Sequence, residues 1–300
     1  MQAAAVGVDR GDPTYVRGVA LTLFTAVAWS FTGLIFRYIE DATSWQVVFF
    51  RASVFTAALA IVFMVRHRMG LLRAILGVGL SGLIAAACLG FGSVFYLHAI
   101  NNTTIANVAF VVSSAPFMAA AMGRIILHEP VARRTWFCIC LALGGVAVMV
   151  AEGFALGGWA GILLALASAA TSAGFTIALR WGRTRDQAPV ILLAGLITMA
   201  VSAPFVGDFT ITSGDLALCA LQGIVISASC NVIFTYCARW VPAAELQLLS
   251  MAESVLSPLW VWLLLSEVPT FWTLVGGVIV LGAVTIQALA AWPRARAAQG

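Results

Sequence analysis

Long apolar runs separated by short polar connections follow one another along the whole chain. A helix rises 1.5 Å per residue, so about 20 apolar residues cross the roughly 30 Å of bilayer hydrocarbon. Ten runs meet that length: 18–36, 45–65, 74–97, 103–127, 131–151, 158–181, 188–206, 215–238, 243–265 and 270–292. The pattern predicts an all-α polytopic membrane protein with ten transmembrane helices and no inserted soluble domain.

The ten runs divide into two similar sets of five. A shift of 138 residues places Glu129 on Glu267, and a shift of 143 places Arg37 on Arg180. Because five is odd, the second copy must enter the membrane upside down relative to the first. Inverted repeats are typical of secondary transporters, whose substrate site lies at mid-membrane between the halves. We expect a tail at 1–17, a first repeat at 18–155, a second, inverted repeat at 156–292, and a tail at 293–300.

Composition supports a membrane environment. The chain of 300 residues is 62% hydrophobic and 9% charged, with a mean hydropathy of +1.02. Soluble domains carry about 25% charged residues. The six cysteines all lie inside apolar runs, where thiols behave as small hydrophobic groups, so neither a disulfide framework nor a metal site is predicted.

All sixteen basic residues are arginines, and their positions predict the orientation. If the N-terminus is cytoplasmic, thirteen arginines fall in inner segments and only Arg37 falls in an outer loop. Cytoplasmic loops carry such an excess, so we expect an inner-membrane protein with both termini in the cytoplasm. The arginines form short clusters between apolar runs, a pattern that does not indicate nucleic-acid binding.

Several motifs occur in a recognisable order: AWSFTGLIFR closing the first run, FFRAS in the second, Pro116 ahead of Glu129 in the fourth, and AES ahead of Glu267 in the ninth. This order resembles the EamA group of the drug/metabolite transporter superfamily over residues 18–292. Members usually have Glu-Pro where this chain has Glu253-Ser254, and Trp-Gly where it has Trp29-Ser30. The resemblance implies two inverted five-helix repeats and transport without a cofactor. Within the group, the chain is similar to YddG-type amino-acid exporters.

Polar and aromatic side chains share helix faces in six of the runs. In the ninth, Ser250, Glu253, Ser257 and Trp260 follow helical spacing along one stripe. Polar groups at mid-membrane tend to face a cavity or the bundle interior, although a single Ser or Thr can instead bond its own helix. The stripes predict a central substrate site lined by Trp29, Tyr96, Asn107, Ser114, Ser172, Phe175, Asn231, Phe234, Glu253, Ser257 and Trp260.

Charged residues inside the runs leave alternatives open. Glu253 could bind a substrate ammonium or a coupling proton, or form a structural hydrogen bond. Arg51 could attract a substrate carboxylate, but snorkelling or pairing with Glu40 or Asp41 is the favoured interpretation. We interpret Glu129 as a structural acid that precedes a helix N-terminus.

Two in-run prolines suggest where helices bend. Pro116 and Pro258 each remove an intrahelical hydrogen bond, in the fourth and ninth runs. We therefore expect hinges at both positions.

The leading hypothesis is a monomeric secondary transporter that works by alternating access, exports amino acids including aromatic ones, and leaves proton coupling open. The alternative within the superfamily is an exporter of lipophilic cations or another metabolite transporter. An intramembrane enzyme is the competing class. It is disfavoured because the chain has three histidines and, within the runs, no acid pair except Glu245 and Glu253.

Overall fold

The computed structural model describes residues 13–67, 77–103, 105–150, 159–183, 187, 189–265 and 271–289. Helices and short connections make up this part of the chain, and no strand occurs in it. Helices are expected in hydrocarbon because each satisfies its own backbone hydrogen bonds where no water is available. The all-helical class predicted from the sequence is therefore confirmed.

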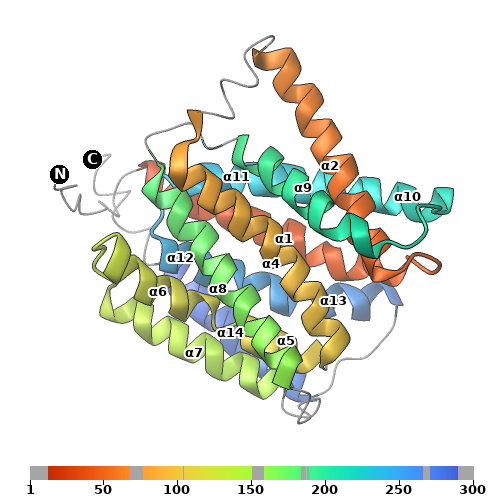
Figure 1. The fold of residues 1–300 in the computed structure, drawn as a ribbon. Helices are drawn as coiled ribbons and strands as arrows, with labels where there is room; N and C mark the ends of the chain where they lie inside the picture. The colour runs from red at the N-terminus through yellow and green to blue at the C-terminus, as the bar shows by residue number, and fades with distance from the viewer. Residues whose placement is uncertain are drawn as a thin grey trace.

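The helices of the first half (Figure 1) are α1 (Pro13–Arg37), α2 (Ser44–His67), α4 (Gly79–Asn102), α5 (Ile105–Val112), α6 (Ala115–Ile126) and α7 (Arg133–Val150). Those of the second half are α8 (Trp159–Trp181), α9 (Pro189–Ser202) with the 3-10 turn η2 (Ala203–Phe205), α10 (Ser213–Ala220), the π-helical η3 (Leu221–Ala228), α11 (Ser229–Cys237), α12 (Ala243–Ser250), α13 (Ala252–Leu265) and α14 (Phe271–Leu289). Pro13 and Pro189 are the first residues of their helices, where a missing N–H costs nothing.

Seven stretches of the described chain are long and apolar enough to cross a membrane: Ser44–Val65, Gly79–Ala99, Asn107–Ile126, Trp159–Trp181, Ser213–Cys237, Ala243–Leu264 and Phe271–Leu289. They correspond to seven of the ten predicted runs. The other three runs coincide with α1, α7 and the shorter apolar helix Pro189–Phe205. The protein is thus a multi-pass membrane protein, and the count of ten spans stays a prediction.

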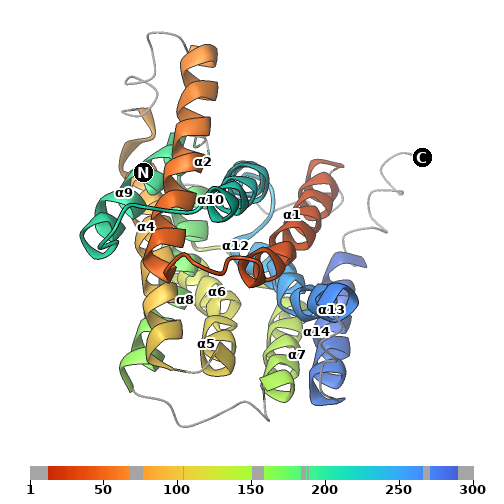
Figure 2. The same cartoon turned by 90° about the vertical axis from the view of Figure 1, so that its right-hand side faces the viewer.

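Two groups of helices face each other across α12 (Figure 2). One contains α1, α7, α13 and α14, and the other contains α2, α4, α8 and α9. The small helix α12 contacts α1, α7 and α14 of the first group and α8 of the second. All its residues except Ser250 are buried. The helix α12 therefore lies at the centre of the molecule and packs against both groups.

Two helices are interrupted. Between α5 and α6 the chain turns at Ser113 and Ser114, and the amide of Ser114 donates to the carbonyl of Val111 at 3.0 Å. Between α12 and α13 it turns at Met251, whose amide donates to the carbonyl of Leu248 at 3.1 Å. These bonds span three residues rather than four, so each helix restarts in a new register.

The predicted hinge prolines lie close to these interruptions. Pro116 is the second residue of α6, so the hydrogen bond that it cannot donate falls at the interruption between α5 and α6. Pro258 lies within α13, and its side chain is outside the described part of the structure. Bending at either residue stays a prediction.

Glycine allows α7 and α14 to pack closely. A Cβ atom at Gly145 would lie 2.8 Å from Cγ2 of Val280 and 2.9 Å from the carbonyl oxygen of Gly276. We expect Gly145→Ala to lower the free energy of unfolding by about 1–3 kcal/mol, because the backbones must separate. Gly144→Ala is the matched control, since its Cβ would meet nothing within 4 Å. Thermal unfolding in detergent measures both, and equal effects would contradict this account.

Candidate functional site

Three aromatic rings from separate helices meet near the centre of the molecule. The ring centroids of Trp29 on α1 and Phe234 on α11 lie 5.4 Å apart, and those of Phe175 on α8 and Phe234 lie 6.1 Å apart. Phe175 and Phe234 are buried, whereas Trp29 is partly exposed. The structure thus brings together three predicted site residues that are far apart in the sequence.

An amide from α12 bonds two residues that flank Phe175 on α8. The side-chain nitrogen of Gln247 donates to the hydroxyl of Thr176 at 2.7 Å and contacts both the carbonyl and hydroxyl oxygens of Ser172, at 3.0 and 3.2 Å. Ser172 was predicted, but Gln247 and Thr176 were not. Gln247 lies three residues before Ser250, so extending the polar stripe of the ninth run by one turn would have found it.

Trp260 and Ser257 belong to α13, which packs against α1. The indole nitrogen of Trp260 donates to the hydroxyl of Ser30 at 2.7 Å, and its ring stacks on Phe31 with centroids 4.6 Å apart. Ser30 stands where the family motif has glycine. This difference from the motif supplies a hydrogen bond between α1 and α13. Ser257 lies nearly one turn before Trp260 and is partly exposed.

Glu253 lies in the first turn of α13, just after the break at Met251. It is partly exposed and close enough to Tyr96 on α4 and Cys230 on α11 to interact electrostatically with both. Within the described chain, its carboxylate forms no hydrogen bond or ion pair. The structural hydrogen bond, one of three alternatives for Glu253, is therefore not formed there.

Three predicted site residues bond groups three or four positions earlier in the chain. The amide of Asn107 donates to the hydroxyl of Thr103 at 2.9 Å, the hydroxyl of Ser114 to the carbonyl of Val111 at 2.6 Å, and the amide of Asn231 to the carbonyl of Ser227 at 2.7 Å. Such local bonds are the structural alternative for polar residues in membrane helices. Substrate contact by these three residues stays a prediction.

Interactions between the halves close one end of the bundle. Glu129, between α6 and α7, pairs with Arg180 at the end of α8, and the Arg180 guanidinium also donates to the carbonyl of Ala238 at 3.2 Å. The hydroxyl of Tyr15 on α1 donates to the buried carboxylate of Glu245 on α12. We call these four side chains, Tyr15, Glu129, Arg180 and Glu245, the seal.

Two interpretations change here. Arg180 was counted among the inner-loop arginines, but it is 2% exposed in the last turn of α8. Glu129 was interpreted as complementing a helix dipole, but it neutralises this buried cation. A guanidinium inside the protein requires such a counter-charge, because the low dielectric strengthens the attraction and penalises an unpaired charge. Without Arg180, twelve arginines still fall in inner segments and only one falls in an outer loop.

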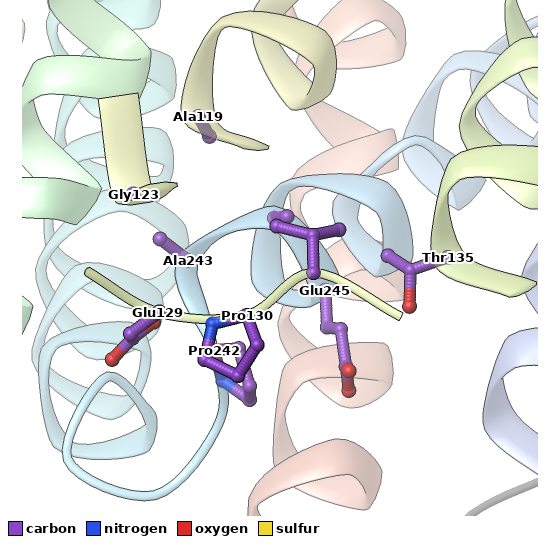
Figure 3. A pocket seen from close by; sticks show the side chains of 10 residues that line it. Ala119, Gly123, Glu129, Pro130, Thr135, Pro242, Ala243 and Glu245 are labelled. Atoms are coloured by element: carbon purple, nitrogen blue, oxygen red, sulfur yellow. The ribbon is translucent and has the colours of Figure 1, made fainter. Parts of the chain in front are cut away.

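The cavity at the seal is small (Figure 3). It has a volume of about 10 Å³ and lies between Glu129 with Pro130 on one connection and Pro242 with Glu245 on the other. That volume holds at most one water molecule. The side chains around this cavity therefore leave no room for a molecule of amino-acid size.

Arg51 differs from its favoured interpretation. Neither Glu40 nor Asp41 pairs with it in the described chain, and its Nε atom is buried without a hydrogen-bond partner there. The backbone amide of Asp41 donates instead to the carboxylate of Asp215 at 3.2 Å. The pairing with Glu40 or Asp41 is therefore not formed in the described chain, and snorkelling of Arg51 stays a prediction.

Comparison with known proteins shows what the first half of the chain is similar to. Residues 16–151 match the EamA-like transporter family. The matched segment is similar to that family and covers somewhat less than half of the chain. The match agrees with the resemblance noted in the sequence motifs.

Relatives named as transporters align with much of the chain. An uncharacterized transporter, YdfC of Bacillus subtilis, is 26% identical over 211 residues, which are 65% of this chain and 68% of the relative. The pseudopaline exporter CntI of Pseudomonas aeruginosa is 24% identical over 248 residues, 79% of this chain and 83% of the relative. A crystal structure of a protein 21% identical in sequence covers 92% of this chain and 98% of its own, with a TM-score of 0.77, and shows the same fold.

Proposed function

We propose that this EamA-like protein is a secondary transporter that exports small amphipathic metabolites, namely amino acids including aromatic ones, by alternating access. The observation that carries the proposal is the pair of interrupted helices. A shift of 138 residues moves Ile105–Val112, the bounds of α5, onto Ala243–Ser250, the bounds of α12. Interrupted helices at corresponding positions of two repeats are the best pointer to a transporter's binding site.

Helix packing supports the inverted repeat. If each helix is replaced by its counterpart in the other repeat, the contact of α4 with α8 corresponds to that of α11 with α1. The contact of α4 with α9 corresponds in the same way to that of η3 with α2. The pairs α7–α14 and α2–α9 map onto themselves. All these contacts occur, as expected if one repeat rocks against the other around a central site.

The residues of the site favour a substrate with an aromatic body and a zwitterionic head. Trp29, Phe175 and Phe234 offer ring contacts worth about 0.5–1.5 kcal/mol each beyond area burial. Glu253 offers a negative charge for an ammonium group. A sugar phosphate would instead require several cationic groups to offset its desolvation. The similarity to YddG-type amino-acid exporters points to the same substrates.

A lipophilic cation is the second candidate, because the Glu253 carboxylate has no bonded partner in the described chain and could neutralise one. The direction of transport is supported by CntI, a relative whose name is that of an exporter. Glu253 is also the residue at which a coupling proton could bind.

Competition among three compounds tests the substrate. Purified protein in liposomes is expected to exchange labelled tryptophan, and unlabelled tryptophan should compete strongly. A quaternary ammonium compound should compete weakly, and a sugar phosphate not at all. Liposomes without protein are the control. Competition by the sugar phosphate alone would reject this assignment of the site, and competition by the quaternary ammonium compound alone would favour the cation exporter.

The orientation is a separate proposal, with both termini in the cytoplasm of an inner-membrane protein. It is supported by the arginine asymmetry and by the odd number of spans in each repeat. Reporter tags inserted at residue 155 and attached at residue 300 are expected to lie on opposite sides of the membrane. Both tags on one side would contradict the inverted repeat.

A further inference from the structure

Gln247 offers a hydrogen-bond acceptor beside the aromatic rings. Its amide nitrogen lies 3.0 Å from the backbone carbonyl oxygen of Ser172. A carbonyl oxygen can only accept, so the atom that faces α8 must be the nitrogen rather than the oxygen of the amide. The usual ambiguity between the two ends of a glutamine side chain is therefore removed at this position.

The oxygen end of the same amide is left without a protein partner. No hydrogen bond to Oε1 of Gln247 occurs within the described chain. The corresponding atoms of Gln187 and Gln222 are enclosed and unbonded, whereas Oε1 of Gln247 keeps some accessible surface. Gln247 as a whole is 8% exposed, so only a group inside the helix bundle can reach its oxygen.

The residues that bond Gln247 flank one of the three aromatic rings. Ser172 and Thr176, which hold the Gln247 nitrogen, lie three residues before and one residue after Phe175 on α8. The ring of Phe175 pairs with Phe234 at 6.1 Å, and Phe234 meets Trp29 at 5.4 Å. An aromatic ring bound against these side chains would present its edge near α12.

We propose that Gln247 is a specificity-determining residue whose Oε1 accepts a hydrogen bond from a ring N–H of the substrate, selecting an indole over rings that lack this donor. The inference rests on the proposed amino-acid transport and names the side chain that the site prefers. A buried acceptor without a donor is costly, so a ligand that lacks the N–H is penalised.

The ammonium group of an amino acid is the other donor that could reach an oxygen. It is better matched to Glu253, because hydrogen bonds between charged groups are about twice as strong as neutral ones. The neutral amide oxygen of Gln247 suits the neutral ring N–H. Gln247 lies before the break between α12 and α13 and Glu253 lies after it, and the proposal assigns them to the two ends of one molecule.

The test compares two ligands that differ at one ring atom. In 3-benzothienyl-L-alanine, a sulfur replaces the indole N–H of L-tryptophan while the shape is kept. Both compete for exchange of labelled tryptophan in liposomes. With the unaltered protein, the analogue is expected to require about tenfold more ligand for half-inhibition. With Gln247→Leu and Gln247→Met, the two ligands should be equal within about twofold.

Gln287→Leu is the matched control. Gln287 is 1% exposed on α14, and neither polar atom of its side chain has a hydrogen-bond partner in the described chain. Its replacement should keep the tenfold preference. Equal inhibition by both ligands in the unaltered protein, or a preference that persists in a folded Gln247 variant, overturns the role of Gln247 while transport stands. Absence of tryptophan exchange by the unaltered protein rejects the proposed function and this inference together.

Discussion

Glu129→Gln is expected to destabilise the protein by about 3–5 kcal/mol, because it removes the counter-charge of a buried guanidinium. The side chain of Arg180 is 1% exposed and that of Glu129 is 22% exposed. Loss of the pair therefore costs more free energy at the cation than at the acid. Its remaining hydrogen bond to the carbonyl of Ala238 does not supply a charge. Thermal unfolding in detergent measures the loss.

The charge-swapped double variant makes this test specific. Glu129→Arg combined with Arg180→Glu restores an ion pair across the same helices, so most of the lost stability should return. Glu40→Gln is the control, since Glu40 is an exposed acid outside the seal and its loss should change stability by less than about 0.5 kcal/mol. A double variant no more stable than either single change would show that the pair does not hold the closed end.

The seal also predicts a change in access. Tyr15–Glu245 and Glu129–Arg180 each join the first half of the chain to the second, so a conformation open at this end must break both. Loss of the pair should therefore shift the protein toward that conformation. A cysteine introduced at Ser172 should react faster with an impermeant thiol reagent added from the sealed side in Glu129→Gln. An unchanged rate would place the closure elsewhere.

Glu253→Gln is expected to reduce substrate transport at least tenfold while leaving the protein folded and inserted. An unpaired carboxylate among apolar helices is costly unless it binds a cation, and glutamine cannot carry the charge. Exchange of labelled tryptophan and thermal unfolding are measured on the same preparation. Normal transport by this variant would contradict both functional roles of Glu253.

A second measurement separates the two functional alternatives for Glu253. If the carboxylate binds a coupling proton, Glu253→Gln should abolish accumulation driven by a pH gradient but preserve exchange without a gradient. If it binds the substrate ammonium, both activities should be lost. Tryptamine, which keeps the ammonium but lacks the carboxylate, should then also stop competing in the variant.

The sequence alone determined the secondary structure and the faces of the helices. Hydrophobic periodicity depends on local spacing, so α8 was expected at 158–181 and is found at Trp159–Trp181. The match of Glu129 with Glu267 and the motif around Trp29 indicated a transporter of the EamA group before any contact was known. Pro116 marked one helix interruption, whereas the turn at Met251 has no comparable signal in its own residues.

The tertiary structure decided which side chains meet. Tyr15 and Glu245 are 230 positions apart and Arg180 and Glu129 are 51 apart, and no periodicity specifies such partners. Arg180 looked like a loop arginine because positive charge near a span end usually faces water. Gln247 was not predicted, because its hydrogen bonds depend on the contact of α12 with α8. Spacing along the chain fixes the direction of a side chain around its own helix, but the neighbour it reaches depends on how distant helices pack.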